Sequence, residues 1–502
     1  MVGVNHPLAS FPSEATCETL NTKVAQRSVN GNKRRRFGGN QSMPSNLASL
    51  SCYDDHASTF RPKDPLEVSS ILKLTSEHNF TASVLNSKGT GTHGDARGGE
   101  IVIDLSSRHF QRIEIDHDAM TVTVGGGVTS RMLDIALCSE SLTTPLVGYT
   151  VGLGAFLSGG FGFSSRLHGL TVDNILDVEV VLADGSVLHA NAYNHIDLFW
   201  ALKGCGTGFG VITGLKLRCY PLVNSVSANI IFPFERSTAA DLMKHWRDCL
   251  EGVPDEVYSN FVMAAGPAAS EPVAILQICH LGDEDVGMPI IDRMAAFSGT
   301  KYHFKDCGEI TYLRQQELVE AVLKGAAVEK SQTPENQVKY LLDGNVLADL
   351  TDEVIEESSL RFLDEAPAGS IWCFELFGGS LAKTTDNCIP SETRAGKFHA
   401  ASILRVPADD QDAWHNDEAG RDWIRSTISK VTTGGPLPSF LPTSSTDARE
   451  AKRYHDVIRG SYGHENWSRL KKLKKQYDSK NCFRYGFDAG MLGLEEQLVD
   501  GL

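Results

Sequence analysis

Several features are missing from this 502-residue sequence, and each absence argues against a class of protein or a kind of site. Its eleven cysteines form no CxxC pair, which argues against a disulfide framework and against a zinc or other metal site. Acidic residues outnumber basic ones by 63 to 47, and the net charge of −16 argues against nucleic-acid binding. The sequence has no signal-peptide pattern and no run of about 18 apolar residues. We therefore expect a cytoplasmic protein without a membrane span.

Glycine, in contrast, is concentrated in one part of the chain. Of the 46 glycines, 21 lie between Gly89 and Gly214, a stretch that contains three glycine-rich loops at 87–99, 149–162 and 203–214. Their spacing does not match a Rossmann fingerprint, and a GxxxxGK[ST] loop is absent. Several glycine loops can bring many backbone N–H groups against one long anionic cofactor. The pattern therefore indicates a dinucleotide that is bound without a Rossmann fold.

Hydrophobic periodicity predicts the elements around these loops. We expect helices within 61–79 and 129–138, and strands at 82–85, 100–105, 112–115, 121–124 and 175–182, the last continuing as a hairpin through 186–190. After residue 222 the glycines thin out, and helices alternate with strands at 228–232, 273–279 and 371–377. This change is typical of a second domain in which helices cover a sheet. A basic helix is expected from Ser461 onward.

The composition and these elements divide the chain into four parts. They are a flexible arm at 1–50, a glycine-rich domain at 51–224, a substrate domain at 225–431 and a C-terminal segment at 432–502 that returns to the glycine-rich domain.

Four segments, in order, resemble motifs of the berberine bridge enzyme-like family. They are KGTGTHG (88–94) followed by EIVIDLS, the segment 150–185 (TVGLGAFLSGGFG and onward), the segment 197–222 (DLFWALKGCGTGFGVITG and onward) and 461–485 (SYGHENWSRLKKLKKQYDSKNCFRY). This family consists of flavoprotein oxidoreductases that share an FAD-binding domain with vanillyl-alcohol oxidase and para-cresol methylhydroxylase. The resemblance implies an α+β fold with a two-part FAD-binding domain and a substrate domain whose antiparallel sheet is covered by helices.

The resemblance also implies how FAD is held. His93 takes the place of the histidine that bonds to the flavin 8α-methyl carbon, and the alternative is a loop histidine that caps a turn. A second covalent bond is excluded because Gly148 stands where bicovalent members have cysteine. The other cofactor contacts implied are Lys88, Gly89, Thr90, Gly91, Thr92, Thr150, Val151, Gly152, Gly154, Ser158, Gly159, Gly162, Leu170, Asp173, Gly210, Val211, Ile212 and Tyr485.

The catalytic base of many family members is missing here. Those members carry a Tyr-x-Asn-Tyr segment, and this chain has Pro-Ser-Phe-Leu-Pro at 438–442 instead. Glu375 and His399 are the candidate replacements, because each lies on an expected strand with apolar neighbours. An ion-paired Glu375 and a structural His399 are the alternatives. Tyr462 matches a family tyrosine ahead of the last helix, and its alternative role is packing.

Two functions are compatible with these residues. The first is FAD-linked oxidation of a small, largely apolar biosynthetic intermediate, in which hydride passes to flavin N5 and molecular oxygen reoxidises the flavin. The second is a redox-neutral cyclisation or isomerisation in secondary metabolism, with FAD as a structural support. Turnover without oxygen and without flavin reduction would indicate the second.

Overall fold

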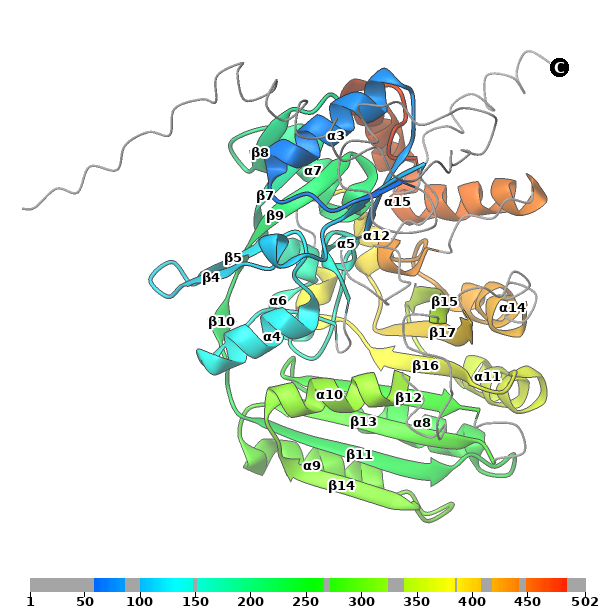
Figure 1. Ribbon diagram of the computed structural model, residues 1–502. Coiled ribbons are helices and arrows are strands. Elements are labelled where there is room, and N and C mark those ends of the chain that lie inside the picture. Colours follow the sequence, from blue (N-terminus) through cyan, green and yellow to red (C-terminus); the bar gives the residue numbers. More distant parts are fainter. Residues whose placement is uncertain are drawn as a thin grey trace, which may run out of the picture.

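The computed structural model describes residues 58–85, 100–147, 151–265, 271–323, 338–383, 386–407, 418–441 and 448–484. Figure 1 shows the glycine-rich part of the chain above a broad sheet that is formed by later residues. No helix in the described segments is long and apolar enough to cross a membrane.

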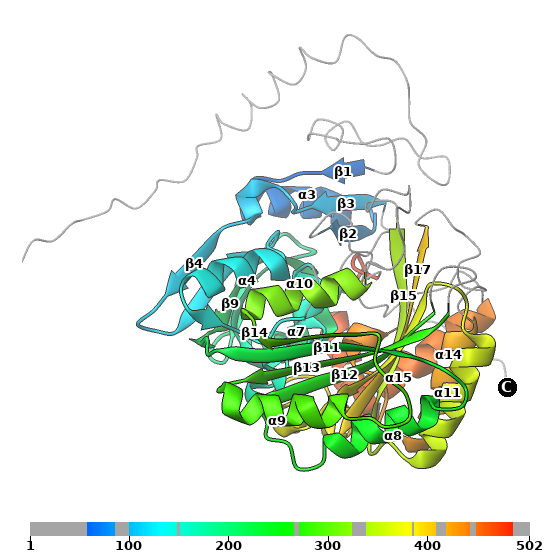
Figure 2. The same ribbon diagram turned by 90° about the horizontal axis from the view of Figure 1, so that it is seen from below.

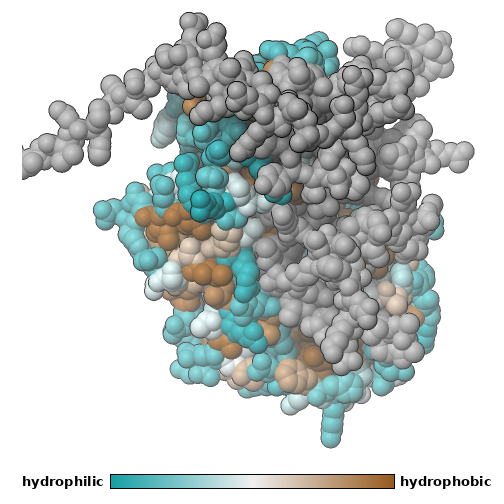
Figure 3. All heavy atoms as spheres, in the orientation of Figure 1, coloured by the Kyte–Doolittle hydropathy of each residue, from teal (hydrophilic) through white to brown (hydrophobic). Residues whose placement is uncertain are grey.

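The glycine-rich part is built around an antiparallel sheet of five strands, in the order β4-β5-β9-β7-β8. The strands are β4 (Ile113–Asp116), β5 (Thr121–Gly125), β7 (Ile175–Leu182), β8 (Val187–Asn191) and β9 (Gly210–Arg218). The helices between and beside these strands include α4 (Ser130–Ser139), α5 (Leu153–Leu157), α6 (Ser165–His168) and α7 (Ile196–Cys205). The strands and the helix expected here are confirmed to within one or two residues at their ends. On the face seen in Figure 3, hydrophobic residues gather near β5 and α4 and much of the remaining described surface is hydrophilic.

A smaller parallel sheet completes this part, with β3 (Ile101–Asp104) between β1 (Ser58–Phe60) and β2 (Ala82–Leu85). Helix α3 (Pro65–Glu77) begins where the Asp64 side chain accepts a hydrogen bond from the Glu67 N–H, 2.8 Å away. Its buried apolar residues join the core of this sheet, and so do Cys482 and Phe483. The Ala82 N–H also donates to the Cys482 carbonyl, at 2.9 Å. The C-terminal residues thus pack against the first strands.

The larger sheet has seven antiparallel strands in the order β14-β11-β13-β12-β16-β17-β15. They are β11 (Ser225–Pro233), β12 (Val257–Ala264), β13 (Val273–Leu281), β14 (Phe304–Glu309), β15 (Val338–Leu347), β16 (Ser370–Leu376) and β17 (Phe398–Pro407). Four helices supply residues to the core on one face: α8 (Ala239–Cys249), α9 (Glu284–Ala295), α11 (Asp352–Glu365) and α14 (Glu418–Ser426). The Trp372 ring of β16 stacks on the Trp423 ring of α14, with centroids 4.5 Å apart. The expected helix-covered antiparallel sheet is confirmed.

Alternation along β16 leaves the other face of this sheet open toward the glycine-rich part. Trp372 and Phe374 belong to the helix-covered core, whereas Cys373 and Glu375 line a cavity on the opposite face. Helix α10 (Tyr312–Leu323) lies on this opposite side, as Figure 2 shows. The sheet thus separates a structural core from a site.

The last helix, α15 (Ala448–Tyr477), is longer than the expected one. It contains a break at Gly463, whose φ of 65° places it in the left-handed region. The expected start at Ser461 therefore lies next to this break, and the helix itself begins 13 residues earlier. The described short elements include β6 (Leu142–Thr143), β10 (Tyr220–Pro221), α12 (Ser391–Arg394) and the 3-10 helix η2 (Thr171–Asn174).

Candidate active site

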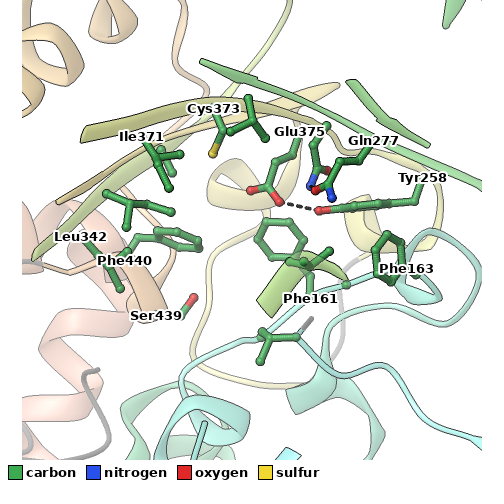
Figure 4. A pocket seen from close by; sticks show the side chains of 18 of the residues that line it. Phe161, Phe163, Tyr258, Gln277, Leu342, Ile371, Cys373, Glu375, Ser439 and Phe440 are labelled. Atoms are coloured by element: carbon green, nitrogen blue, oxygen red, sulfur yellow. Dashed lines mark hydrogen bonds between the residues drawn. The ribbon is translucent and has the colours of Figure 1, made fainter. Parts of the chain in front are cut away.

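A cavity lies between the open face of the seven-stranded sheet and the glycine loop that follows α5. Much of its wall is apolar, and Figure 4 shows the Phe161 and Phe440 rings facing the side chains of β16. Several of its polar side chains come from three neighbouring strands. They are Tyr258 and Asn260 of β12, Gln277 of β13 and Glu375 of β16. The cavity can therefore hold a largely apolar molecule that presents polar groups to the sheet.

Glu375 is the acidic residue in the wall of this cavity, and two side chains hold it. The Tyr258 hydroxyl donates to Glu375 Oε1, as the dashed line in Figure 4 marks. His399 Nδ1 lies 2.9 Å from Glu375 Oε2, and because an ionised carboxylate only accepts hydrogen bonds, the ring donates. A carboxylate has about four lone-pair directions, so two remain for a ligand. Tyr258 and His399 thus fix the orientation of the Glu375 carboxylate and leave two of its hydrogen-bond acceptor positions for a ligand.

His399 contacts Glu375 but does not itself line the cavity. Its side chain is fully buried, and its ring lies 4.3 Å from the Phe440 ring and 5.2 Å from the Phe161 ring, between centroids. The two strands put it there, because His399 of β17 pairs directly with Glu375 of β16. The structure therefore joins two of the three residues that the sequence indicated as catalytic.

Tyr462, the third, is placed elsewhere. Its ring is buried and stacks near Trp467, and its hydroxyl donates to the Gly204 carbonyl at 2.9 Å. It does not line the cavity, and its contacts correspond to the packing alternative.

Tyr258 and Asn260 were missed by the sequence reasoning. Their strand, β12, reads VYSNFVMA and is buried on both faces, so it lacks a clear apolar and polar alternation. The available signal was the polar pair itself, because two residues spaced by two in a strand share one face.

Cys373, next to Glu375 in sequence, also faces the cavity. Burial raises the pKa of its thiol well above the usual value, and the nearby Glu375 charge acts in the same direction. The side chain is therefore a neutral thiol rather than a nucleophile.

The loop at Gly159 and Gly160 is suited to holding a polar cofactor against the cavity. Both residues have left-handed φ values, 123° and 70°. Their carbonyls accept hydrogen bonds from the Val172 and Thr171 N–H groups, at 3.0 and 2.8 Å. Within the described part of the chain, neither glycine N–H has an acceptor. Two backbone donors are thus left for a ligand with oxygen or nitrogen acceptors, which fits a flavin ring.

Several of the other implied cofactor contacts are engaged within the protein itself. Gly162 and Gly210 lie against backbone carbonyls, since a Cβ would come within 2.0 Å of Leu146 O and 2.6 Å of Val181 O. Ser158 Oγ donates to the Gly154 carbonyl at 2.9 Å. The remaining members in this group are buried in the core or precede α5: Val151, Gly152, Leu170, Val211 and Ile212. The residues Lys88, Gly89, Thr90, Gly91, Thr92, His93, Thr150 and Tyr485 lie outside the described part.

Asp173 was expected beside the cofactor, and its carboxylate is held by the protein. Arg394 forms a buried ion pair with it, with Nη1 3.1 Å from Oδ1. The Asn387 side chain and the Leu170 N–H also donate to it, each at 2.9 Å. Asp173 therefore ties η2 to α12, which lies between β16 and β17 in sequence.

Comparisons with known proteins agree with this architecture. A family described as FAD binding domain matches residues 57–191, and one described as berberine and berberine like matches residues 458–486. Berberine bridge enzyme-like 27 of Arabidopsis thaliana is 28% identical over 374 residues, which cover 72% of this chain and 66% of the relative. FAD-linked oxidoreductase pgmH of Aspergillus terreus is 33% identical over 160 residues, which cover 32% of each chain. The chain thus spans slightly less than two thirds of the first relative and about a third of the second.

The solved structure of 6-hydroxy-D-nicotine oxidase from Arthrobacter nicotinovorans shares the fold. It matches with a TM-score of 0.72 at 22% identity, and the match covers 88% of this chain and 94% of that one. The expected α+β fold is confirmed by this likeness.

Proposed function

We propose a function from the premise that this chain belongs with the berberine bridge enzyme-like FAD-linked oxidoreductases. The proposed reaction is oxidation of a hydroxyl, amine or C–H centre of a small, largely apolar molecule. The supporting observation is that Glu375 lines an apolar cavity while Tyr258 and His399 hold its carboxylate.

In this proposal FAD, when bound, supplies a two-electron acceptor that molecular oxygen regenerates. The Gly159 and Gly160 N–H groups would donate to it from the loop after α5. Glu375 accepts the proton of the substrate hydroxyl or amine on one of its remaining lone pairs. Tyr258 and His399 keep the carboxylate in one orientation while the proton moves. The Phe161 and Phe440 rings exclude water from the site.

Covalent attachment through His93 remains part of the proposal. Acid precipitation of the purified protein should leave yellow colour in the pellet, and His93→Ala should release the colour to the supernatant. A colourless wild-type pellet would show that the bond does not form.

The cytoplasmic location that the sequence predicts also stays a prediction.

Oxygen consumption tests the reaction class. With a panel of small aromatic and allylic alcohols and amines, at least one member should drive oxygen uptake and release of hydrogen peroxide. The same member should bleach the flavin when oxygen is removed. Conversion of a substrate without oxygen and without bleaching would instead support the redox-neutral cyclase or isomerase.

A further inference from the structure

A row of polar side chains crosses the open face of the seven-stranded sheet. Asn229 of β11 pairs with Gln277 of β13, and Gln277 pairs with Asn260 of β12. Asn260 in turn pairs with Glu375 of β16. Directly opposite residues on one face have Cβ atoms about 5 Å apart, so the four side chains form a continuous line.

The three amides of this row form a relay. Asn260 Nδ2 donates to Gln277 Oε1 at 3.4 Å, and Gln277 Nε2 donates to Asn229 Oδ1 at 2.9 Å. The relay turns the Asn260 nitrogen toward Gln277, which leaves its oxygen to be satisfied elsewhere.

That oxygen is a buried acceptor in the cavity wall. Asn260 is 7% exposed and lines the cavity, and Oδ1 has no hydrogen-bond partner in the described part of the chain. Buried polar groups in native proteins are usually paired, so an unpaired one facing a cavity indicates a ligand group. Ser439 Oγ is also unpaired among the described residues, but Figure 4 places Ser439 beside Phe440, away from Gln277.

We propose that Asn260 Oδ1 accepts a hydrogen bond from a second donor of the substrate, a hydroxyl or N–H group, next to the group that Glu375 deprotonates. This inference rests on the proposed function and narrows its substrate class. Because Asn260 and Glu375 are direct neighbours across two strands, the two substrate donors lie on adjacent or next-but-one carbon atoms. The substrate is therefore a largely apolar molecule with a pair of neighbouring donors, such as a phenol that carries a benzylic alcohol.

Binding to the FAD-loaded protein tests this inference. The probes are ortho- and meta-hydroxybenzyl alcohol, each compared with the analogues in which methyl or methoxy replaces the ring hydroxyl. Dissociation constants come from the change in flavin absorbance. The wild type should bind at least one hydroxyl probe roughly tenfold more tightly than both analogues, the factor expected for one hydrogen bond.

Two variants assign the preference to Asn260. Asn260→Leu should abolish it, whereas Asn260→Asp, which keeps an acceptor, should retain it. Thermal unfolding and flavin content verify that both variants fold. Equal binding of the hydroxyl and methyl probes, binding of none of them, or a preference unchanged in Asn260→Leu would overturn the inference. Tight binding of the methoxy analogue would also overturn it, because a methoxy group only accepts hydrogen bonds and cannot donate one to Asn260 Oδ1.

Flavin bleaching separates this inference from the proposed function. A hydroxyl preference without flavin bleaching would contradict the oxidation and leave the Asn260 contact standing. Bleaching of the flavin without a preference for the hydroxyl probes would support the oxidation and contradict the Asn260 contact.

Discussion

Glu375 depends on a neighbour that does not reach the cavity. His399 lies behind the wall, packed against Phe440 and Phe161, and touches the site through one hydrogen bond to Glu375 Oε2. Its hydrogen-bonding influence on a reaction in the cavity therefore passes through the Glu375 carboxylate, whereas its ring also packs against two residues of the cavity wall. His399 is in this sense a positioning residue.

Substitution of His399 separates positioning from packing. Asn places its Nδ2 donor near the position of the imidazole Nδ1, so His399→Asn should retain much of kcat. His399→Leu keeps the bulk without the donor and should lower kcat by about tenfold to a hundredfold, the range for a hydrogen bond to a charged group. KM should change little in either variant, because His399 is not in the wall. Equal losses in the two variants would contradict a positioning role.

Adding one methyl group at Gly160 tests whether the loop at Gly159 and Gly160 holds the cofactor. A Cβ at Gly160 would come within 2.7 Å of Thr171 Oγ1, at a φ of 70°. Gly160→Ala should therefore displace the loop and lower the ratio of bound flavin to protein, measured by absorbance. Gly252→Ala is the matched control, because Gly252 has a φ of 68° but open space around it. A Gly160→Ala protein with full flavin content would contradict the assignment of this loop to the cofactor.

Between elements, one buried ion pair connects the two parts of the chain. Arg394 is fully buried in α12, and its guanidinium binds Asp173 of η2 and, through Nε, the Leu381 carbonyl at 3.0 Å. Removal of one partner leaves a buried charge unpaired, which is costly, whereas removal of both charges costs less.

Arg394→Met should accordingly lower the free energy of unfolding by about 3 to 5 kcal/mol. The double variant Arg394→Met with Asp173→Asn should recover a large part of this loss. Arg236→Met is the control, because its pair with Asp364 is more than half exposed and should matter little. Urea unfolding measures all three, and a double variant no more stable than Arg394→Met would contradict the account.

Helices α4 and α10 meet at a second buried acid. Asp134 of α4 is 3% exposed and accepts a hydrogen bond from Gln316 Nε2 of α10, at 3.1 Å. Burial raises its pKa from the usual 3.8 to about 8. The folded protein therefore keeps a neutral Asp134 at neutral pH, where the unfolded chain would ionise it.

The sign of the pH dependence follows from this shift. Below pH 3.8 the carboxyl is protonated in both states, and its stabilising effect is fully present. Between 3.8 and about 8 only the folded state keeps the proton, so the free energy of unfolding falls as the pH rises. Asp134→Asn removes the ionisable carboxyl and should raise the melting temperature above that of the wild type, more at about pH 8 than at about pH 5. Asp306→Asn, on the exposed edge strand, should show no such trend. A constant difference across pH would contradict a neutral Asp134.

At the scale of the whole molecule, the sequence predicted the features that depend on local patterns but not the contacts between residues far apart in the chain. The alternation in 371–377 correctly placed Glu375 opposite the Trp372 face, because that rule needs only neighbours in sequence. The contact of Glu375 with His399 depends on the register of β16 against β17, which a single sequence does not contain. The partner of Asp173 lies 221 residues away and escaped prediction for the same reason.

The measurement that tests the central claim most directly is flavin reduction in a single turnover without oxygen. Glu375→Gln keeps the shape of the side chain and removes its ability to take a proton. Once a substrate is found, the variant should bind it with an unchanged flavin spectrum but reduce the flavin about a hundredfold to ten-thousandfold more slowly than the wild type. Glu309→Gln, on the exposed edge strand of the same sheet, should match the wild type. Reduction by Glu375→Gln at the wild-type rate would show that Glu375 is not the base.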